Sequence, residues 1–247
     1  MSDRRVRIDR VDVDDIGFRG AVARIAELAT AGAGGYVATV NVDYLVRAHG
    51  DPAFRDLLSG ARLRVPDGMG IVYGARLAGI RLHGSVTGRL LPEAIARLPN
   101  SPPMGLMGGQ HGAGAKAAAR LEALGGQVHA TASPPMGFAV GGPEDREAVE
   151  RLAEAEPQVL FVGLGSPKQD EWMAAHAADL PRTVMVGVGQ AIDVLGGFQP
   201  AAPAWMTRIG LEWAYRLAHE PRRLARRYLW DDPRFFWWML QARRARR

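Results

Sequence analysis

Residues 159–169 read VLFVGLGSPKQ, and this stretch decides the class of fold. The first four residues are all apolar and predict a strand. The glycines at 163 and 165 indicate a turn, and a helix is predicted over 170–177. A strand followed directly by a turn and a helix is typical of an α/β domain.

The same alternation of strands and helices runs through most of the chain before this stretch and just after it. The other predicted strands cover 36–42, 62–65, 104–107, 127–130 and 183–188. The other predicted helices include 70–77, 92–98 and 113–124. This order predicts an α/β, Rossmann-like domain with a mostly parallel sheet flanked by helices. Ligands of such sheets bind at the carboxyl ends of the strands, so the loops that follow the strands are the candidate site.

Composition excludes several classes of protein. With 247 residues, of which 47% are hydrophobic and 23% charged, the chain is globular and neither disordered nor fibrous. It has no cysteine, which excludes disulfides, iron–sulfur clusters and a cysteine nucleophile and favours a reducing compartment. We expect no signal peptide, because acidic residues and no apolar stretch follow the first five residues. We expect no membrane-spanning segment, because no apolar run approaches about 18 residues.

The excess positive charge is confined to the end of the chain. Residues 216–247 hold 10 Arg against 3 acidic residues, a balance of +7, whereas residues 1–215 have a balance of −2. Aromatic residues alternate with these arginines, as they do in segments that lie at an interface. We therefore predict an α/β catalytic domain over 1–207 and a basic, aromatic, helical appendage over 208–247.

Two partners suit a basic aromatic appendage. Nucleic acid would use arginines on phosphates and aromatic rings for stacking, whereas a membrane surface would use arginines on anionic headgroups. Residues 235–240 read FFWWML, a bulky apolar block that favours an anionic membrane surface over nucleic acid. A third interpretation, that this block is a helix buried in the core, stays open.

Several polar residues lie where strands are predicted to end. Asp67 follows the strand 62–65 in a Pro-Asp-Gly turn, where it is either a turn residue or a rigidly held general base. Thr39 and Asn41 interrupt an apolar strand, so they need hydrogen-bond partners or a ligand. A serine cap and a first-turn proline account for Ser166 and Pro167 but leave Gln169 unexplained.

A glycine-rich turn links the strand 104–107 to the next helix. Backbone N–H groups at Gly108 and Gly109 could hold a phosphate there, or the glycines could serve a plain tight turn. The spacing matches neither standard nucleotide fingerprint, which weakens a nicotinamide enzyme. Asp193 is either a helix cap or a ligand for a hydroxyl or imide group. The six histidines show no metal-binding spacing, and we expect no metal site and no cofactor.

Taken together and in order, these motifs resemble the bacterial WecG/TagA/CpsF family of glycosyltransferases over nearly the whole chain. The matching stretches read TVN at 39–41, ARLRVPDGMG at 61–70, LMGG at 106–109, PPMGF at 134–138, VGLGSPKQ at 162–169, VGVG at 186–189, LEWAYRL at 211–217 and EPRR at 220–223. No single stretch is decisive, but their order and spacing are specific.

The resemblance implies an activity. It is an inverting transfer of a sugar from a UDP donor to a polyprenyl-diphosphate-linked saccharide, without an essential metal. The reaction takes place at the cytoplasmic, inner face of the cell membrane during synthesis of a surface polysaccharide such as teichoic acid. The sugar would be N-acetylmannosamine or its uronic acid, or a glucose-type sugar as in other members. Members of the family form oligomers, so the resemblance is compatible with a homo-oligomer.

The resemblance also assigns roles to residues. Asp67 takes the family's base position, and Thr39, Asn41 and Gln169 match polar positions of its pocket. Arg216, Arg222 and Arg223 are the candidates for arginines that the appendage brings over the substrate. The positions implied near the nucleotide are Gly108, Gly109, Gly137 and Asp193.

The chain departs from the family pattern at three places. Arg89 stands where a carboxylate is common, Asp170 where Glu is usual, and Ala201 where an arginine is usual. These changes put the sugar specificity in doubt. Two other functions stay open on the sequence: a nucleotide-binding oxidoreductase, and a membrane- or RNA-associated adaptor that uses the appendage.

Overall fold

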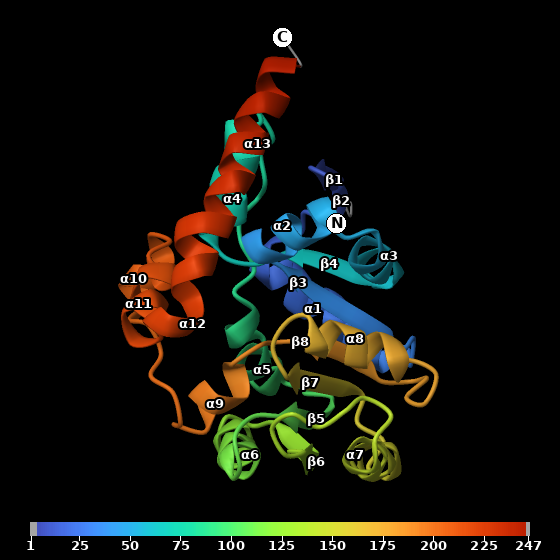
Figure 1. Ribbon diagram of the computed structural model, residues 1–247. Coiled ribbons are helices and arrows are strands. Elements are labelled where there is room, and N and C mark those ends of the chain that lie inside the picture. Colours follow the sequence, from blue (N-terminus) through green and yellow to red (C-terminus); the bar gives the residue numbers. More distant parts are fainter. Residues whose placement is uncertain (1–3, 246–247) are drawn as a thin grey trace.

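The structure, a computed structural model, describes residues 4–245, without the side chains of Ala204, Arg208, Arg223 and Ala245. A six-stranded sheet in the order β4-β3-β8-β7-β5-β6 forms its centre, and every pair of neighbouring strands is parallel (Figure 1). The strands are β3 (Gly35–Val40), β4 (Leu63–Pro66), β5 (Pro103–Gly108), β6 (Gln127–Ala132), β7 (Val159–Gly163) and β8 (Val184–Gly187). The predicted fold class is confirmed.

Helices cover both faces of the sheet and divide the core into two clusters. One cluster includes α2 (Val42–Gly50), α3 (Pro52–Gly60), α4 (Met69–Leu77), α7 (Pro143–Glu154) and α8 (Lys168–Ala175). The other includes α1 (Gly17–Thr30), α5 (Leu91–Ala96), α6 (Ala113–Ala123) and α9 (Ala191–Leu195). Strand residues alternate between the clusters: Leu160 and Val162 face the first, and Val159 and Phe161 the second. A fully apolar strand is therefore the expected sequence for a sheet that is covered on both sides.

A short antiparallel hairpin precedes the sheet. It consists of β1 (Arg5–Ile8) and β2 (Val11–Asp14). The Asp14 carboxylate accepts a hydrogen bond from the backbone N–H of Arg64 at 2.8 Å, which fixes the hairpin to β4. No strand is predicted over residues 5–8 from the sequence, so β1 and its pairing with β2 were missed.

The chain ends in a helical tail that crosses the carboxyl edge of the sheet and then packs on the body (Figure 1). Its elements are α10 (Ala204–Arg208), α11 (Glu212–His219), α12 (Pro221–Arg226), a π-helical turn η2 (Arg227–Asp231) and α13 (Asp232–Ala245). We refer to residues 204–245 as the tail. Within residues 4–245, no helix is both long enough and apolar enough to cross a bilayer.

The apolar block at 235–240 has two environments. Phe235 is fully buried and Met239 is 2% exposed, and both belong to the first core cluster. A Cβ at Gly74 of α4 would lie 2.0 Å from the Phe235 ring, so only glycine lets α13 approach this closely. Trp237, by contrast, is 55% exposed. The prediction that this block serves membrane contact is therefore wrong for Phe235 and Met239. These two side chains are part of a helix that packs on the core, which was the alternative interpretation.

Candidate active site

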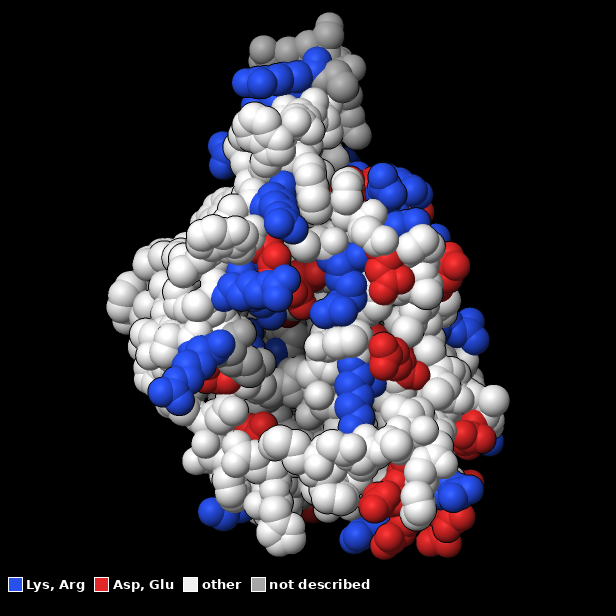
Figure 2. Space-filling model, in the orientation of Figure 1, with Lys and Arg blue, Asp and Glu red and all other residues white. Residues whose placement is uncertain are grey.

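A cavity of about 760 Å³ lies at the carboxyl ends of β3, β4, β7 and β8, under the tail. The face of the molecule in Figure 2 is hollowed, and Lys and Arg side chains gather along the hollow. Four residues predicted from the sequence line this cavity from below, and we refer to them as the pocket floor: Thr39, Asn41, Asp67 and Gln169. The tail covers them with four residues that we refer to as the pocket roof: Glu212, Tyr215, Arg216 and Arg227.

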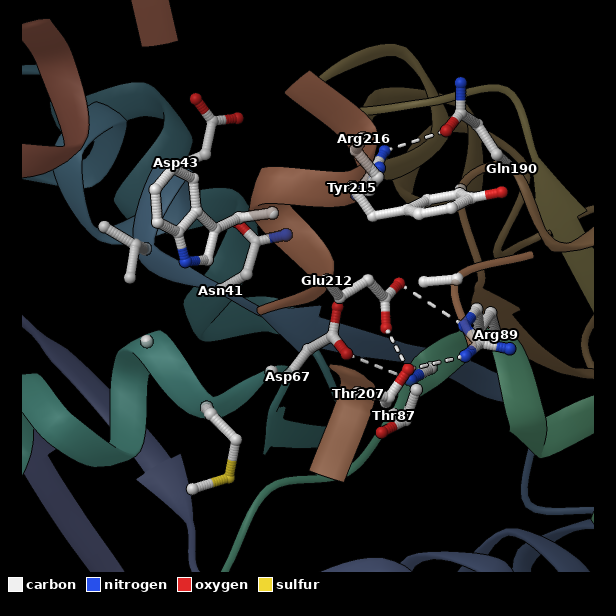
Figure 3. Close-up of a pocket in the computed structure, with 18 of the residues that line it drawn as sticks. Asn41, Asp43, Asp67, Thr87, Arg89, Gln190, Thr207, Glu212, Tyr215 and Arg216 are labelled. Carbon is white, nitrogen blue, oxygen red and sulfur yellow. Dashed lines mark hydrogen bonds and ion pairs between the residues drawn. The ribbon is translucent and has the colours of Figure 1, made fainter. Parts of the chain in front are cut away.

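Asp67 is held by the backbone on two sides. Its N–H donates to the carbonyl oxygen of Val40 at 2.8 Å, which extends the pairing of β3 and β4 by one residue. Its Oδ1 accepts a hydrogen bond from the N–H of Gly88 at 3.0 Å. Gly68 follows with a positive φ of 78°, which turns the chain into α4 and leaves the carboxylate at the pocket floor (Figure 3).

The environment of Asp67 suits a general base. Burial raises the pKa of Asp67 to about 6, because desolvation disfavours the carboxylate. The Gly88 hydrogen bond lowers the pKa, Glu212 raises it, and the guanidinium groups of Arg216 and Arg227 lower it. The carboxylate therefore predominates at neutral pH, and its pKa is close enough to the working pH for efficient proton transfer.

The other floor residues are fixed by hydrogen bonds. Thr39 Oγ1 donates to the carbonyl oxygen of Gly187 at 2.8 Å. Gln169 accepts from the N–H of Gly189 at 3.0 Å and donates to the hydroxyl of Tyr44 at 2.9 Å. Asn41 caps α2 by accepting from the N–H of Tyr44 at 3.3 Å. Each side chain is thus held in one orientation.

Asp170, a departure from the family pattern, lies behind the floor. It is fully buried and accepts a hydrogen bond from the Tyr44 hydroxyl at 2.8 Å. Burial raises the pKa of Asp170 to about 7, while the hydrogen bond from Tyr44 lowers it. Because Tyr44 also binds Gln169, this carboxyl group supports the floor from below.

Two arginines of the roof reach the cavity. Arg216 Nη2 donates to Gln190 Oε1 at 2.8 Å (Figure 3). The amide of Gln190 in turn donates to Glu220 at 3.1 Å. Arg227 Nη2 donates to Asn41 Oδ1 at 3.3 Å, and Arg227 Nε lies 3.6 Å from the carboxylate of Asp43. Arg227 was not among the predicted site residues, although the basic composition of the tail was a signal for it.

The other predicted arginines have different places. The Arg222 side chain is exposed and does not line the cavity. Arg223 belongs to α12, but its side chain lies outside the described part of the structure. Their roles stay predictions.

A polar cluster joins the roof to the wall of the cavity. Arg89 Nε lies 3.3 Å from Glu212 Oε1, and Arg89 Nη2 donates to Thr207 Oγ1 at 3.0 Å (Figure 3). The Thr207 hydroxyl donates to Glu212 Oε2 at 3.2 Å. Arg89 was noted only as a departure from the family pattern, and its partner in the tail was not predicted.

The residues predicted near the nucleotide do not line this cavity. Gly108 and Gly109 have positive φ angles of 100° and 80°, and a Cβ at Gly108 would lie 2.6 Å from the carbonyl oxygen of Gly163. Asp193 is 8% exposed and accepts from the N–H of Gln110 at 2.7 Å, so it holds the glycine-rich turn. Gly137 is exposed in the loop after β6. Packing explains the two turn glycines and a hydrogen bond explains Asp193; their nucleotide role stays a prediction.

The cations of the cavity are guanidinium groups. Arg89, Arg216 and Arg227 all line it, together with five acids: Asp43, Asp67, Glu212, Glu220 and Asp232. In the part of the chain that the structure describes, no group of three or more His, Asp and Glu side chains is placed to hold a metal ion. The arrangement can accept a proton at Asp67 and stabilise negative charge beside it.

Comparison with known proteins identifies the family of this chain. An N-acetylglucosaminyldiphosphoundecaprenol N-acetyl-beta-D-mannosaminyltransferase of Bacillus subtilis is 31% identical over 199 residues, which cover 78% of this chain and 75% of that protein. The enzyme of the same name from Staphylococcus aureus strain MRSA252 is 27% identical and covers 85% of this chain and 81% of its own length. The family model of the WecG/TagA/CpsF glycosyl transferases matches residues 6–247. The chain therefore belongs to the WecG/TagA/CpsF family of glycosyl transferases.

Proposed function

We propose that this protein transfers a sugar from a UDP donor to a saccharide linked to polyprenyl diphosphate, with inversion at the anomeric carbon. The sugar is N-acetylmannosamine or a close relative such as its uronic acid or a glucose-type sugar. The observation that carries the proposal is Asp67, a carboxylate with a pKa of about 6 on the floor of a cavity that three arginines line. The names of the relatives support the acceptor, since they carry N-acetylglucosaminyldiphosphoundecaprenol.

The reaction needs one base. As the acceptor hydroxyl oxygen bonds to the anomeric carbon, Asp67 takes the hydroxyl proton. The bond between that carbon and the diphosphate oxygen breaks, and UDP leaves with the electron pair. Attack on the face opposite the leaving group inverts the configuration. The Gly88 N–H holds Asp67 in the orientation from which it can receive the proton.

The leaving group develops negative charge that the roof can stabilise. Arg216 is already oriented by Gln190, which lowers the cost of ordering it around a diphosphate. Arg227 has only long ion pairs, at 3.6 Å to Asp43 and 3.8 Å to Asp232, so a diphosphate can compete for it. Both guanidinium groups come from the tail, and the roof therefore supplies the charge while the floor supplies the base.

The tail also suits the proposed place of the reaction, the inner face of the cell membrane. Trp205, Leu229 and Trp230 are 59%, 56% and 70% exposed, and the Arg226 side chain is 90% exposed. Indole rings together with arginines favour an anionic bilayer surface. Salt-dependent sedimentation with anionic vesicles, compared with RNA of equal charge, separates this partner from the adaptor alternative.

The test is acceptor-dependent release of UDP from a panel of UDP-sugars, with a lipid-diphosphate-linked N-acetylglucosamine in anionic vesicles. Asp67→Asn should lower turnover by at least about a hundredfold at an unchanged melting temperature. Asp56→Asn, an exposed residue of α3 outside the cavity, is the matched control. Near-normal turnover of Asp67→Asn would remove the base assignment. NAD(P) binding without UDP binding would favour the oxidoreductase alternative, which family membership leaves without support.

A further inference from the structure

The mouth of the cavity differs in character from its floor. Four large side chains line the cavity and are also open to solvent: Tyr73, Ile209, Leu211 and Trp213 are 44%, 52%, 36% and 44% exposed. We refer to these four residues as the apolar rim. The floor below them is polar and the roof carries arginines, so the cavity is polar in its depth and apolar at its edge.

The apolar rim is held together by contacts between α4 and the tail. Tyr73 belongs to α4, and the other three residues belong to the connection from α10 to α11 and the start of α11. The Tyr73 hydroxyl donates to the carbonyl oxygen of Ile209 at 3.4 Å. A Cβ at Gly210 would lie 2.7 Å from the Cβ of Met69, so glycine is what lets the two segments meet. The rim thus forms where the body and the tail are in direct contact.

A cavity with this division of polarity matches an amphiphile. Contiguous exposed apolar side chains beside a cavity mark a binding surface. The guanidinium groups of Arg216 and Arg227 attract a diphosphate, whereas an apolar chain attached to that diphosphate must leave the cavity past its edge. Resting on the proposed function, we propose that the apolar rim binds the first isoprene units of the polyprenyl-diphosphate acceptor and leads the chain out of the cavity.

The rim differs from the tail residues that suit a bilayer. Trp205 and Trp230 are more exposed, at 59% and 70%, and do not line the cavity. The rim residues contact both the cavity and solvent, which is the position of a passage between the site and the membrane surface. This difference predicts that changes in the rim alter discrimination between chain lengths, whereas changes at Trp205 or Trp230 alter binding to vesicles.

The first experiment measures binding without transfer. Farnesyl diphosphate and dimethylallyl diphosphate share a headgroup and differ only in chain length, and their dissociation constants are measured by calorimetry on the full chain without vesicles. The wild type should bind farnesyl diphosphate at least about tenfold more tightly, since each buried methylene adds to the affinity. Tyr73→Ser and Ile209→Ser should reduce this ratio to about threefold or less.

Two control variants test whether a loss of chain-length preference depends on the rim. Tyr73→Phe removes only the hydroxyl and should keep the ratio, and Met136→Ser changes a 96% exposed apolar residue outside the cavity. A wild-type ratio near one, or rim variants that keep the full ratio, would overturn the proposal. A reduced ratio in Tyr73→Ser and in Met136→Ser alike would also count against it, because the effect would not depend on the rim.

The second experiment links the rim to transfer. The ratio of kcat/KM for a long-chain acceptor to kcat/KM for a short-chain acceptor should fall about tenfold in Ile209→Ser. An equal loss on both acceptors would refute the role of the rim. If the wild type transfers to neither acceptor but shows the chain-length preference in binding, the proposed function fails and the rim assignment stands.

Discussion

The floor and the roof of the cavity are built in different ways. Thr39, Asp67 and Gln169 on the floor are fixed by hydrogen bonds with backbone groups of Gly187, Gly88 and Gly189. Glu212, Arg216 and Arg227 of the roof are held by side chains, at distances from 2.8 to 3.8 Å. A backbone partner stays available whichever side chain its residue carries. Charged side chains that pair with one another can instead exchange partners. The floor is therefore suited to holding a base in one position, and the roof is suited to binding and releasing a charged leaving group.

The anchor of the roof gives the largest expected effect. Phe235→Ala should lower the free energy of unfolding by about 3–5 kcal/mol, because the ring fills the space beside Gly74 in the core. Denaturation by urea, followed by circular dichroism, measures this change. Trp237→Ala, at a position of the same helix that is 55% exposed, should cost much less. Equal costs for the two variants would mean that α13 is not anchored through Phe235.

The charge of the roof comes next. Arg216→Gln should lower kcat by about a hundredfold, because it removes a donor aimed at the developing negative charge. Arg222→Gln should have the smaller effect, since the Arg222 side chain is exposed and does not line the cavity. Steady-state rates in vesicles test both variants. If Arg222→Gln is the more severe, the tail must rearrange before the reaction.

The pH dependence sharpens the role of the floor. A base acts as its carboxylate, so kcat/KM should be level above the pKa of Asp67, about 6, and fall about tenfold per pH unit below it. At pH 5 the rate should thus be about one tenth of the plateau. A profile that stays flat down to pH 4.5 would contradict a base with a raised pKa.

The smallest effect tests the contact between the two regions. Glu212 raises the pKa of Asp67, so Glu212→Gln should move the acidic limb of the profile to lower pH. We expect a shift of a few tenths of a pH unit, measured on the same assay. A shift to higher pH would mean that Glu212 affects Asp67 through the geometry of the roof and not through its charge.

The floor could be predicted from the sequence because strand ends meet at one edge of a parallel sheet. Thr39 and Asn41 lie within a predicted strand, and Asp67 lies just after another. Gln169 follows the turn after a third predicted strand, and all four residues line one cavity. The strand and helix predicted at 159–177 correspond to β7 and α8.

The roof could not be predicted to the same extent. Arg227 reaches Asn41 across 186 residues, and no local pattern selects it from the neighbouring arginines. The burial of Phe235 depends on the space beside Gly74, which composition does not reveal. The same amphipathic composition suits a core helix and a membrane-facing helix, so only the packing distinguishes them.

The hydrogen bond from Gly88 to Asp67 has a consequence for how this family can diversify. The amide that orients the base belongs to the backbone, and the residues on either side of it, Thr87 and Arg89, both line the cavity. Their side chains can be replaced without loss of that amide. Substitutions at these two positions can therefore reshape the lining of the cavity while the hydrogen bond to Asp67 is kept, so that the shape of the cavity and the orientation of this carboxylate can vary independently.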